Sequence, residues 1–403
     1  MKKVNGGVTA APGFRCAGVS CGIKSTRNAR DLGLIVSDAP AAAACAFTTN
    51  RVQAAPIILS RQRLGRRRMH GLVVNAGNAN ACTGKQGLRD AERMTELAGS
   101  ELGVPPESLF VASTGIIGHR MPMDRVQRGI TKASRALGSS ADYNSALAEA
   151  IMTTDLVPKS AAVECRIGNR NVRIGGVAKG SGMIAPNMAT MLAFLTTDCA
   201  IQTGLLRRAL KEVVSRTFNR VTVDGDCSTN DMTVCLANGR AENRPINTTG
   251  KAYDVFVNGL LDVCTELARA IARDGEGATK LITVNVTGAS SGKAADLVAR
   301  SIAESPLVKT AIFGGDPNWG RIICAAGNSG ADVEPDRMTL KINNVCLFRG
   351  GSPRNVRADR LVKCMKPDEI LIELDLGQGH AGTTMWTCDL TGDYIRINAE
   401  YHT

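Results

Sequence analysis

Short apolar runs typical of strands alternate with longer amphipathic segments typical of helices along all 403 residues of the chain. In the longer segments, apolar side chains recur at helical spacing, which predicts helices with one buried face; these segments are 88–102, 204–217 and 253–272. The short runs predict strands; these runs are 109–112, 191–195, 221–223, 232–236, 281–286, 338–342, 369–376 and 394–398. The alternation restricts the fold to the α/β or α+β class, in which sheets and helices form layers.

A chain of this length has room for two domains. The turn at residues 274–278 lies between a predicted helix and a predicted strand, and strands are more frequent after it. We therefore expect a main domain over residues 1–280 and a smaller C-terminal α/β domain over residues 281–403. A doubly wound nucleotide-binding fold is disfavoured, because no Gly-x-Gly-x-x-Gly motif follows an early strand.

The amino-acid composition indicates a cytoplasmic protein. No apolar run approaches the length needed to cross a membrane, and the first residues lack the hydrophobic stretch of a signal peptide. The chain has 13 cysteines without a Cys-x-x-Cys pair, which argues against a disulfide framework and against a structural zinc site. We expect reduced, mostly buried thiols.

The formal net charge of +12 raises nucleic acid as a partner. The densest basic run is Arg61–Arg68, which contains no aromatic residue to stack on a base and accompanies no known nucleic-acid-binding signature. We interpret it as a solvated surface loop, with a polyanion-binding patch as the alternative. Salt-dependent retention on DNA, lost when residues 66–68 are neutralised, would favour that alternative.

Common catalytic motifs are absent from the sequence. The four histidines lie in no recognisable nucleophile motif, and the chain has no Gly-x-Ser-x-Gly, His-Glu-x-x-His or EF-hand pattern. The segment around Lys179 resembles a phosphate-binding loop only partly, because the lysine precedes the glycine instead of following it.

The stretch KGSGMIAPNMAT, residues 179–190, leads directly into an apolar segment. One interpretation is a turn before a buried strand. The other is that the chain cuts itself between Ala189 and Thr190, so that Thr190 gains a free α-amino group. Such an amine has a pKa of about 7.7–8.0 and can accept the proton of the threonine hydroxyl. A protonated Lys179 nearby would lower that pKa further. The residue types alone leave both interpretations open.

KGSGMIAPNMATML, residues 179–192, resembles the self-cleavage motif of the ornithine acetyltransferase family, also called the glutamate N-acetyltransferase or arginine-biosynthesis bifunctional family. Other stretches similar to this family are NAGNANACTG from Asn75, STGIIG from Ser113, TTD from Thr153, FNRVTVDGD from Phe218, GEGATK from Gly275, SPLVKTAIFGGDPNWGRI from Ser305 and CDLTGDYIRIN from Cys388. The resemblance therefore covers essentially the whole chain.

The resemblance implies that Thr190 is the nucleophile, released by cleavage of the Ala189–Thr190 bond into an alpha chain, 1–189, and a beta chain from 190. It assigns Thr114 and Gly115 to the oxyanion hole. It also implies a set of substrate-binding residues, which are Thr153, Lys179, Thr190, Glu276, Asn398 and Thr403.

The implied reaction is a ping-pong transfer of the acetyl group of N2-acetyl-L-ornithine to L-glutamate. No metal or redox cofactor is implied, and the resemblance leaves open whether acetyl-CoA is also an acetyl donor. The alpha and beta chains are expected to associate as a heterotetramer of two of each, without nucleic acid or membrane partners. The alternative is a self-processed N-terminal-nucleophile aminopeptidase or amidase, which would release acetate whether or not an acceptor is present.

The sequence departs from the family pattern at two places. Cys227 stands where threonine is expected, and residues 383–387 differ from the small residues that usually precede CDLT. Neither departure falls on a residue to which the resemblance assigns a role.

Overall fold

The computed structural model describes residues 1–65, 68–185 and 191–400. It forms two compact units: the first holds Met1–Asn219 and Asp226–Leu267, and the second holds Arg220–Gly225 and Ala268–His402. The division falls inside the long helix α6 (Lys251–Arg273), whereas the sequence suggested the turn that follows this helix.

Residues 220–225 belong to the second unit because they bond to its sheet. Val221 forms an isolated bridge with Trp386, and the Thr222 backbone N–H donates to the Trp386 carbonyl oxygen at 3.0 Å. A turn signal in the sequence cannot reveal such a contact, since its partners lie far apart in the chain.

The first unit contains a nine-stranded sheet with the order β1-β6-β7-β8-β9-β3-β4-β5, to which β2 is added by pairing with β3. The strands are β1 (Lys2–Lys3), β2 (Phe14–Val19), β3 (Leu32–Phe47), β4 (Met69–Asn78), β5 (Leu109–Ile116), β6 (Lys159–Ile167), β7 (Arg170–Lys179), β8 (Leu192–Thr197) and β9 (Met232–Ala237). The pairs β4–β5 and β8–β9 are parallel, and the other described pairs of this sheet are antiparallel.

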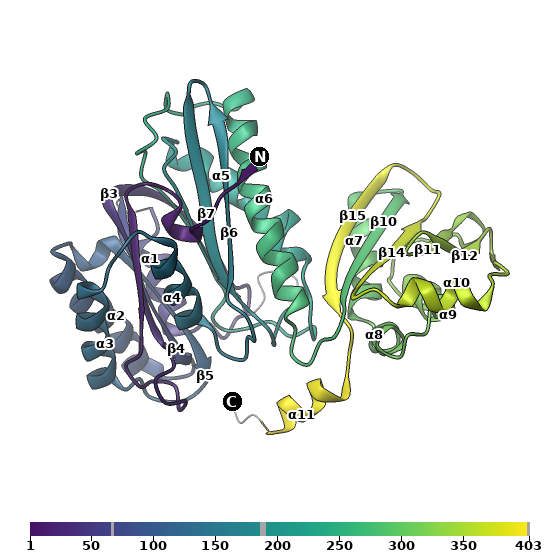
Figure 1. Ribbon diagram of the computed structural model, residues 1–403, viewed down its shortest axis with the longest axis horizontal. Helices are drawn as coiled ribbons and strands as arrows, with labels where there is room; N and C mark the ends of the chain where they lie inside the picture. The colour runs from purple at the N-terminus through teal and green to yellow at the C-terminus, as the bar shows by residue number, and fades with distance from the viewer. Residues whose placement is uncertain (66–67, 186–190, 401–403) are drawn as a thin grey trace. The chain divides into compact units, whose positions relative to one another are not determined.

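Strand β3 connects two halves of this sheet (Figure 1). Its first residues pair with β2 and β4, its last residues pair with β9, and the β3–β4 register shifts between Val36 and Ala41. Both halves contribute to one buried apolar cluster, whose members include Ile35, Leu72, Val74, Phe110, Phe194 and Val234. The halves therefore face each other across this cluster, as in a two-layer β-sandwich.

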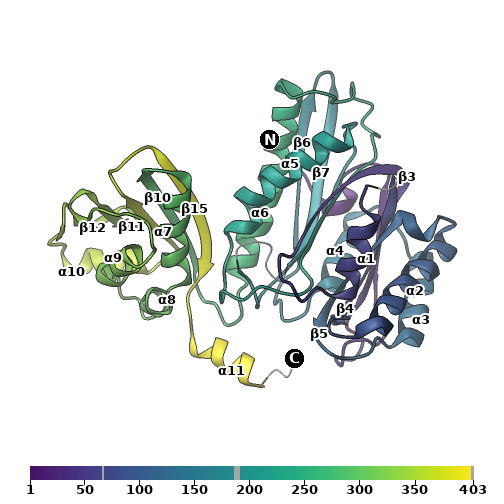
Figure 2. The same ribbon diagram turned by 180° about the vertical axis from the view of Figure 1, so that it is seen from behind.

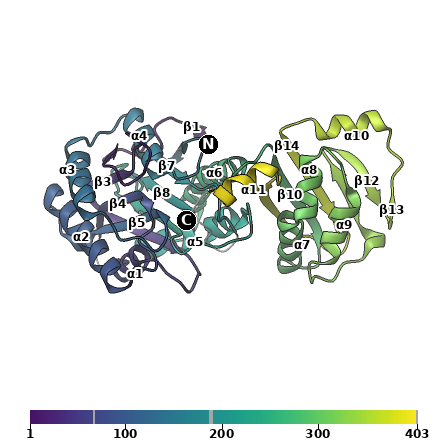
Figure 3. The ribbon, with the colours of Figure 1, turned by 90° about the horizontal axis from the view of Figure 1, so that it is seen from below.

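Helices surround the two halves, and α4 (Ala141–Ile151) adds Leu147, Ala148 and Ile151 to the cluster enclosed between them. In the first unit they are α1 (Ala55–Arg63), α2 (Gly84–Leu102), α3 (Met123–Arg135), α4 (Ala141–Ile151), α5 (Thr203–Arg216) and the greater part of α6. Helices α2 and α3 lie side by side against the half that contains β4 and β5, where Met94 and Ile130 join a second apolar cluster (Figure 3). Helix α6 runs along β6 and β7 (Figure 1), so close that a Cβ atom at Gly259 would lie 3.0 Å from Ile174 Cδ1.

The second unit contains a six-stranded sheet with the order β13-β12-β11-β14-β10-β15. The strands are β10 (Leu281–Ala289), β11 (Thr339–Ile342), β12 (Val345–Arg349), β13 (Ser352–Pro353), β14 (Glu369–Asp375) and β15 (Ala381–Cys388). The helices are α7 (Gly292–Glu304), α8 (Pro306–Phe313), α9 (Trp319–Gly327), α10 (Ala358–Met365) and α11 (Gly392–Glu400), seen from behind in Figure 2. Ile282, Val284 and Val286 of β10 are fully buried, as their alternation in the sequence predicts.

Short 3₁₀ helices complete the described secondary structure; they are η1 (Gly7–Thr9), η2 (Pro106–Ser108), η3 (Phe218–Arg220) and η4 (Pro335–Arg337). In the described ranges, no helix combines the length and the apolar character that crossing a membrane requires. The predicted mixed α/β class with layered sheets and helices is confirmed.

Two strand predictions are wrong. Residues 394–398 lie in helix α11, because the Thr391 side chain accepts hydrogen bonds from the backbone N–H groups of Asp393 and Tyr394 and so caps a helix. Residues 221–223 form no strand beyond the bridge at Val221.

The interpretation of Arg61–Arg68 as a solvated loop is wrong for its first residues, which end helix α1. The Arg63 side chain is buried and donates to the carbonyl oxygens of Pro106 and Leu109 at 3.0 and 2.8 Å. The Arg61 guanidinium lies 4.8 Å from the ring centroid of Phe47. Arg66 and Arg67 lie outside the described residues.

Asp198 links β7 to β8 and provides a test of the fold. Its Oδ1 accepts the Arg173 backbone N–H at 2.8 Å. Arg173 and Asp198 lie next to Ile174 and Thr197, the last paired residues of β7 and β8. Burial raises the pKa of the Asp198 carboxyl from 3.8 to about 6. The Asp198 carboxyl therefore ionises less readily in the folded chain than in the unfolded one. As the pH rises from the unfolded-state pKa to the folded-state pKa, this carboxyl lowers the free energy of unfolding.

We expect Asp198→Asn to remove this pH dependence. The free energy of unfolding of the variant minus that of the native chain should increase by about 1–3 kcal/mol between about pH 4 and about pH 7. One pKa unit corresponds to about 1.4 kcal/mol. Chemical unfolding across this pH range measures the difference. A difference that stays constant with pH would contradict the assignment.

Candidate active site

Thr114 and Gly115, the residues predicted to form an oxyanion hole, lie near the end of β5. Thr114 is 4% exposed. Gly115 has φ 128°, and a Cβ atom there would lie 2.4 Å from the Gly77 carbonyl carbon. Close packing against β4 therefore requires glycine at this position whatever its role in catalysis.

Hydrogen bonds fix the chain just before these residues. The Ser113 hydroxyl donates to Asn75 Oδ1 at 2.6 Å, and the Ser113 carbonyl oxygen accepts a bond from Asn230 Nδ2 at 2.8 Å. The hydroxyl and the carbonyl group of Ser113 are thus both engaged.

Thr153 and Lys179, two of the predicted substrate-binding residues, contact each other. Lys179 is the last residue of β7, and its Nζ donates to Thr153 Oγ1 at 2.7 Å. Asp155 holds both: it accepts the Thr153 backbone N–H at 3.0 Å and lies 3.8 Å from Lys179 Nζ. Lys159 Nζ donates to the same carboxylate at 2.7 Å.

This group of charges is buried. The side chains of Asp155, Lys159 and Lys179 are at most 3% exposed, so two cations share one anion among these three residues. Burial alone would raise the pKa of Asp155, but the ammonium groups of Lys179 and Lys159 outweigh it and hold that pKa below its usual range. The Asp155 carboxylate is therefore the shared ionic partner of two buried lysines.

Neither residue type nor family resemblance assigned a role to Asp155 or Lys159. Asp155 was nevertheless visible as the last residue of the TTD stretch, and that position was the available signal. Nothing in the sequence indicated that Lys159 is buried at the site, because a lysine at the start of a strand usually points to solvent.

Glu276 and Asn398, predicted substrate-binding residues of the second unit, also contact each other. The Asn398 side chain donates to Glu276 Oε2 at 2.8 Å. Glu276 follows α6 and is 9% exposed, and Asn398 lies on α11, where it also donates to the Tyr394 carbonyl oxygen at 3.0 Å. A carboxylate in this setting suits an ammonium group.

Three predicted residues lie outside the described residues: Ala189, Thr190 and Thr403. Met191, which follows Thr190, is described, and its backbone N–H donates to Asp231 Oδ1 at 3.0 Å. Burial raises the pKa of the Asp231 carboxyl well above its usual range, and the neighbouring Cys227 adds to this effect. Cys227 Sγ lies 3.8 Å from Asp231 Oδ2, so this departure from the family pattern contacts the residue that binds Met191.

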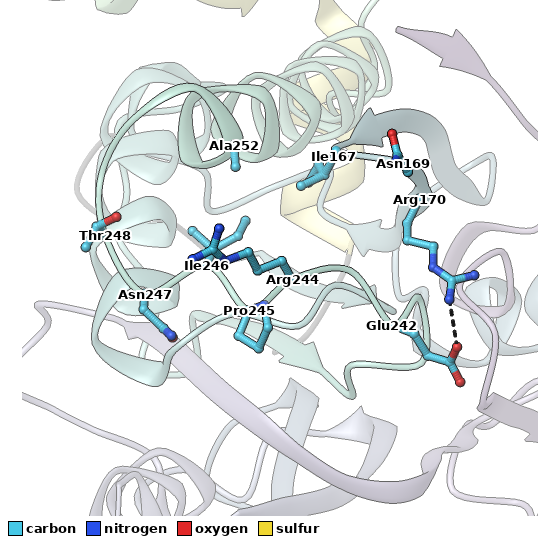
Figure 4. A pocket seen from close by; sticks show the side chains of 11 residues that line it. Ile167, Asn169, Arg170, Glu242, Arg244, Pro245, Ile246, Asn247, Thr248 and Ala252 are labelled. Atoms are coloured by element: carbon cyan, nitrogen blue, oxygen red, sulfur yellow. Dashed lines mark hydrogen bonds and ion pairs between the residues drawn. The ribbon is translucent and has the colours of Figure 1, made fainter.

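A cavity of about 760 Å³ lies elsewhere in the first unit (Figure 4). Its walls are the turn between β6 and β7 and residues 242–248, with an ion pair of 3.2 Å between Arg170 and Glu242. None of the predicted site residues lines it. Among the described residues, no group of three or more His, Cys, Asp or Glu side chains is placed to hold a metal ion.

Comparison with known proteins places this chain among the acyltransferases of arginine biosynthesis. The ArgJ family model matches residues 15–403. The arginine biosynthesis bifunctional protein ArgJ of Symbiobacterium thermophilum is 48% identical over 404 residues, which cover 100% of both chains.

One solved structure agrees with this assignment. A crystal structure of the arginine biosynthesis bifunctional protein of Bacillus halodurans is 44% identical, with a TM-score of 0.50; the match covers 51% of this chain and 97% of that chain. An ornithine acetyltransferase of Mycobacterium tuberculosis, solved in complex with ornithine, is 39% identical over 45% of this chain and 95% of that chain, with a TM-score of 0.42. The present chain belongs to the ArgJ family, the bifunctional acyltransferases of arginine biosynthesis. The resemblance inferred from the motifs is confirmed.

The buried charges give a direct test of the site. We expect Asp155→Asn to lower the free energy of unfolding by about 3–5 kcal/mol at pH 7, because it leaves buried lysines without their anion. Since the pKa of Asp155 is depressed, its stabilisation is complete above about pH 4 and is lost as the pH falls further. The difference between the native chain and the variant should shrink accordingly in unfolding measurements at acid pH.

Glu164→Gln is the control for this measurement. Glu164 pairs with Arg173 at 2.9 Å, but the Arg173 side chain is 45% exposed, so we expect a loss of about 0–1 kcal/mol. Equal losses for the two variants would contradict the importance of the buried cluster.

Proposed function

We propose that this enzyme transfers the acetyl group of N2-acetyl-L-ornithine to L-glutamate through an acetyl ester on Thr190, formed after the chain cleaves itself between Ala189 and Thr190. The observation that carries the proposal is the match over the full length of the chain to a bifunctional ArgJ protein.

The comparison with Bacillus halodurans supports the cleavage step. A match that covers 97% of that chain covers only 51% of this one, so the polypeptide in that crystal is about half as long. A cut before Thr190 would likewise divide this chain into two parts of similar length. The chemistry is self-contained, because the hydroxyl of Thr190 can attack the Ala189 carbonyl and the resulting ester can be hydrolysed by water.

In the proposed transfer, Thr190 Oγ attacks the acetyl carbonyl of acetylornithine while the α-amino group of Thr190 accepts the hydroxyl proton. Thr114 and Gly115 stabilise the oxyanion, an interaction that contributes about 2.7–4 kcal/mol per donor in acyl-transfer enzymes. Ornithine leaves after it takes up the proton. Glutamate then attacks the acetyl ester and departs as N-acetylglutamate, which regenerates the free hydroxyl.

The substrate contacts follow from charge. Lys179 and Thr153 would bind carboxylate or carbonyl oxygens, since an ammonium group and a hydroxyl group both donate hydrogen bonds to such oxygens. Glu276, which Asn398 orients, would bind the side-chain ammonium of the ornithine group. Thr403 completes the proposed contacts.

The subunit assembly and the cellular location are also proposals. The alpha and beta chains would remain associated as a heterotetramer of two of each and act in the cytoplasm. Acetyl-CoA would be a second acetyl donor, as the name bifunctional of the relatives suggests.

An assay with acetylornithine labelled in its acetyl group tests the reaction. The proposed enzyme yields labelled N-acetylglutamate, and it consumes substrate at a steady rate only when glutamate is present. Release of labelled acetate at the same rate with and without glutamate would instead indicate the amidase alternative. A parallel reaction with acetyl-CoA and glutamate tests the second donor.

We expect Thr190→Ala to remain one uncut chain and to lose transfer by about 10³-fold or more, because both nucleophile and base are removed. Thr190→Ser retains a hydroxyl and should still cleave, but more slowly, because it lacks the methyl group that restricts χ1. Intact-mass analysis measures cleavage. Normal transfer by Thr190→Ala would rule out the proposed ester.

A further inference from the structure

The segment Ser228–Asp231, called here the STND segment, lies directly before β9 and joins parts of the first unit that are distant in sequence. Its residues are between 0% and 8% exposed. It follows the stretch FNRVTVDGD, residues 218–226, which resembles the family, and the resemblance assigned it no role.

Asn230 binds the chain beside the proposed oxyanion hole. Its Nδ2 donates to the carbonyl oxygens of Ser113 and Ala79, at 2.8 and 2.7 Å. Its Oδ1 accepts the Thr229 hydroxyl at 2.5 Å, so the orientation of the amide is fixed. Because Ser113 precedes Thr114, these bonds hold the end of β5 in place.

Asp231 binds the chain beside the proposed nucleophile. Its Oδ1 accepts the Met191 backbone N–H at 3.0 Å, and this N–H belongs to the peptide group that links Thr190 to Met191. The Met232 N–H donates to the Met191 carbonyl oxygen at 3.1 Å. Two hydrogen bonds therefore join the start of β8 to the start of β9, one through the Asp231 side chain and one through the Met232 backbone.

The STND segment is itself anchored to the chain between β3 and α1. The Thr48 hydroxyl donates to the Ser228 carbonyl oxygen at 2.7 Å, and the Ala54 N–H donates to the Thr229 carbonyl oxygen at 3.0 Å. The Thr48 N–H donates to the Asp231 carbonyl oxygen at 2.9 Å. These bonds leave the segment little freedom to move independently of the sheet.

We propose that Asn230 and Asp231 are positioning residues for acyl transfer: together they set the spacing between the peptide that follows Thr190 and the strand end that carries Thr114 and Gly115. This inference rests on the proposed function. A nucleophile and its oxyanion donors must be aligned closely, and a displacement of about 1 Å can reduce the rate about 10²-fold.

Asn243 supplies a matched control, because it is an equally buried asparagine with a purely structural set of bonds. It is 4% exposed, its Nδ2 donates to the carbonyl oxygens of Ala200 and Arg244, and its Oδ1 accepts the Ala200 N–H. None of these partners belongs to the strand ends of the proposed site.

The first experiment compares Asn230→Ala with Asn243→Ala. The fraction of cleaved chain is measured by intact mass, and kcat and KM are normalised to the cleaved protein. We expect both variants to lower the midpoint of thermal unfolding by similar amounts. Asn230→Ala should lower kcat about 10²-fold with KM for acetylornithine within about threefold, whereas Asn243→Ala should keep kcat within about threefold.

The second experiment uses Asp231, so that the inference stays testable even if Asn230→Ala fails to fold. The Oδ1 of an asparagine can still accept the Met191 N–H, so Asp231→Asn should keep kcat within about tenfold. Asp231→Ala cannot accept this bond, and we expect it to lose kcat about 10²-fold.

A kcat of Asn230→Ala equal to that of Asn243→Ala, or a kcat of Asp231→Ala equal to that of Asp231→Asn, would overturn the positioning role. In either case, normal cleavage and transfer by the native enzyme would leave the proposed function intact. An uncut and inactive native chain would instead overturn the proposed function itself.

Discussion

The apolar cluster enclosed between the two halves of the first sheet determines how the surrounding strand ends are held. Strands such as β4, β5 and β8 are buried on both faces, so most polar groups near their ends need partners inside the protein. Those partners come from distant parts of the chain, as when Asn230 binds the Ser113 carbonyl oxygen. The core thereby fixes the strand ends, and the strand ends carry the residues to which we assign chemistry.

Electrostatics adds a second constraint. Asp155 lies between two lysines that are almost fully buried, and it bonds to the backbone N–H groups of Thr153 and Gly180. A buried ammonium group is costly without an ionic partner, and Asp155 supplies that partner to both lysines. Glu276 and Asn398 offer the opposite charge in the second unit.

Sequence periodicity predicted helices α2, α5 and α6 because each buries one face, and it predicted β10 because that strand is half-buried. It failed at α11, where the capping side chain of Thr391 outweighs a strand-like apolar pattern. Motif resemblance identified the family and indicated Thr153 and Lys179 as candidate substrate-binding residues. It could not reveal Asp155, Asn230 or Asp231 as structural partners, since their hydrogen bonds join residues far apart in the chain.

The strand order has a consequence for a chain cut before Thr190. Strands β8 and β9 would belong to the downstream polypeptide, yet they lie between β7 and β3, which belong to the upstream one. The ladders β7–β8 and β3–β9 would then be the seams of a single sheet built from two polypeptides. Separating the products would open the apolar cluster between the two halves of the sheet along both seams, because that cluster takes residues from both polypeptides. The first sheet would therefore have to form before the chain is severed.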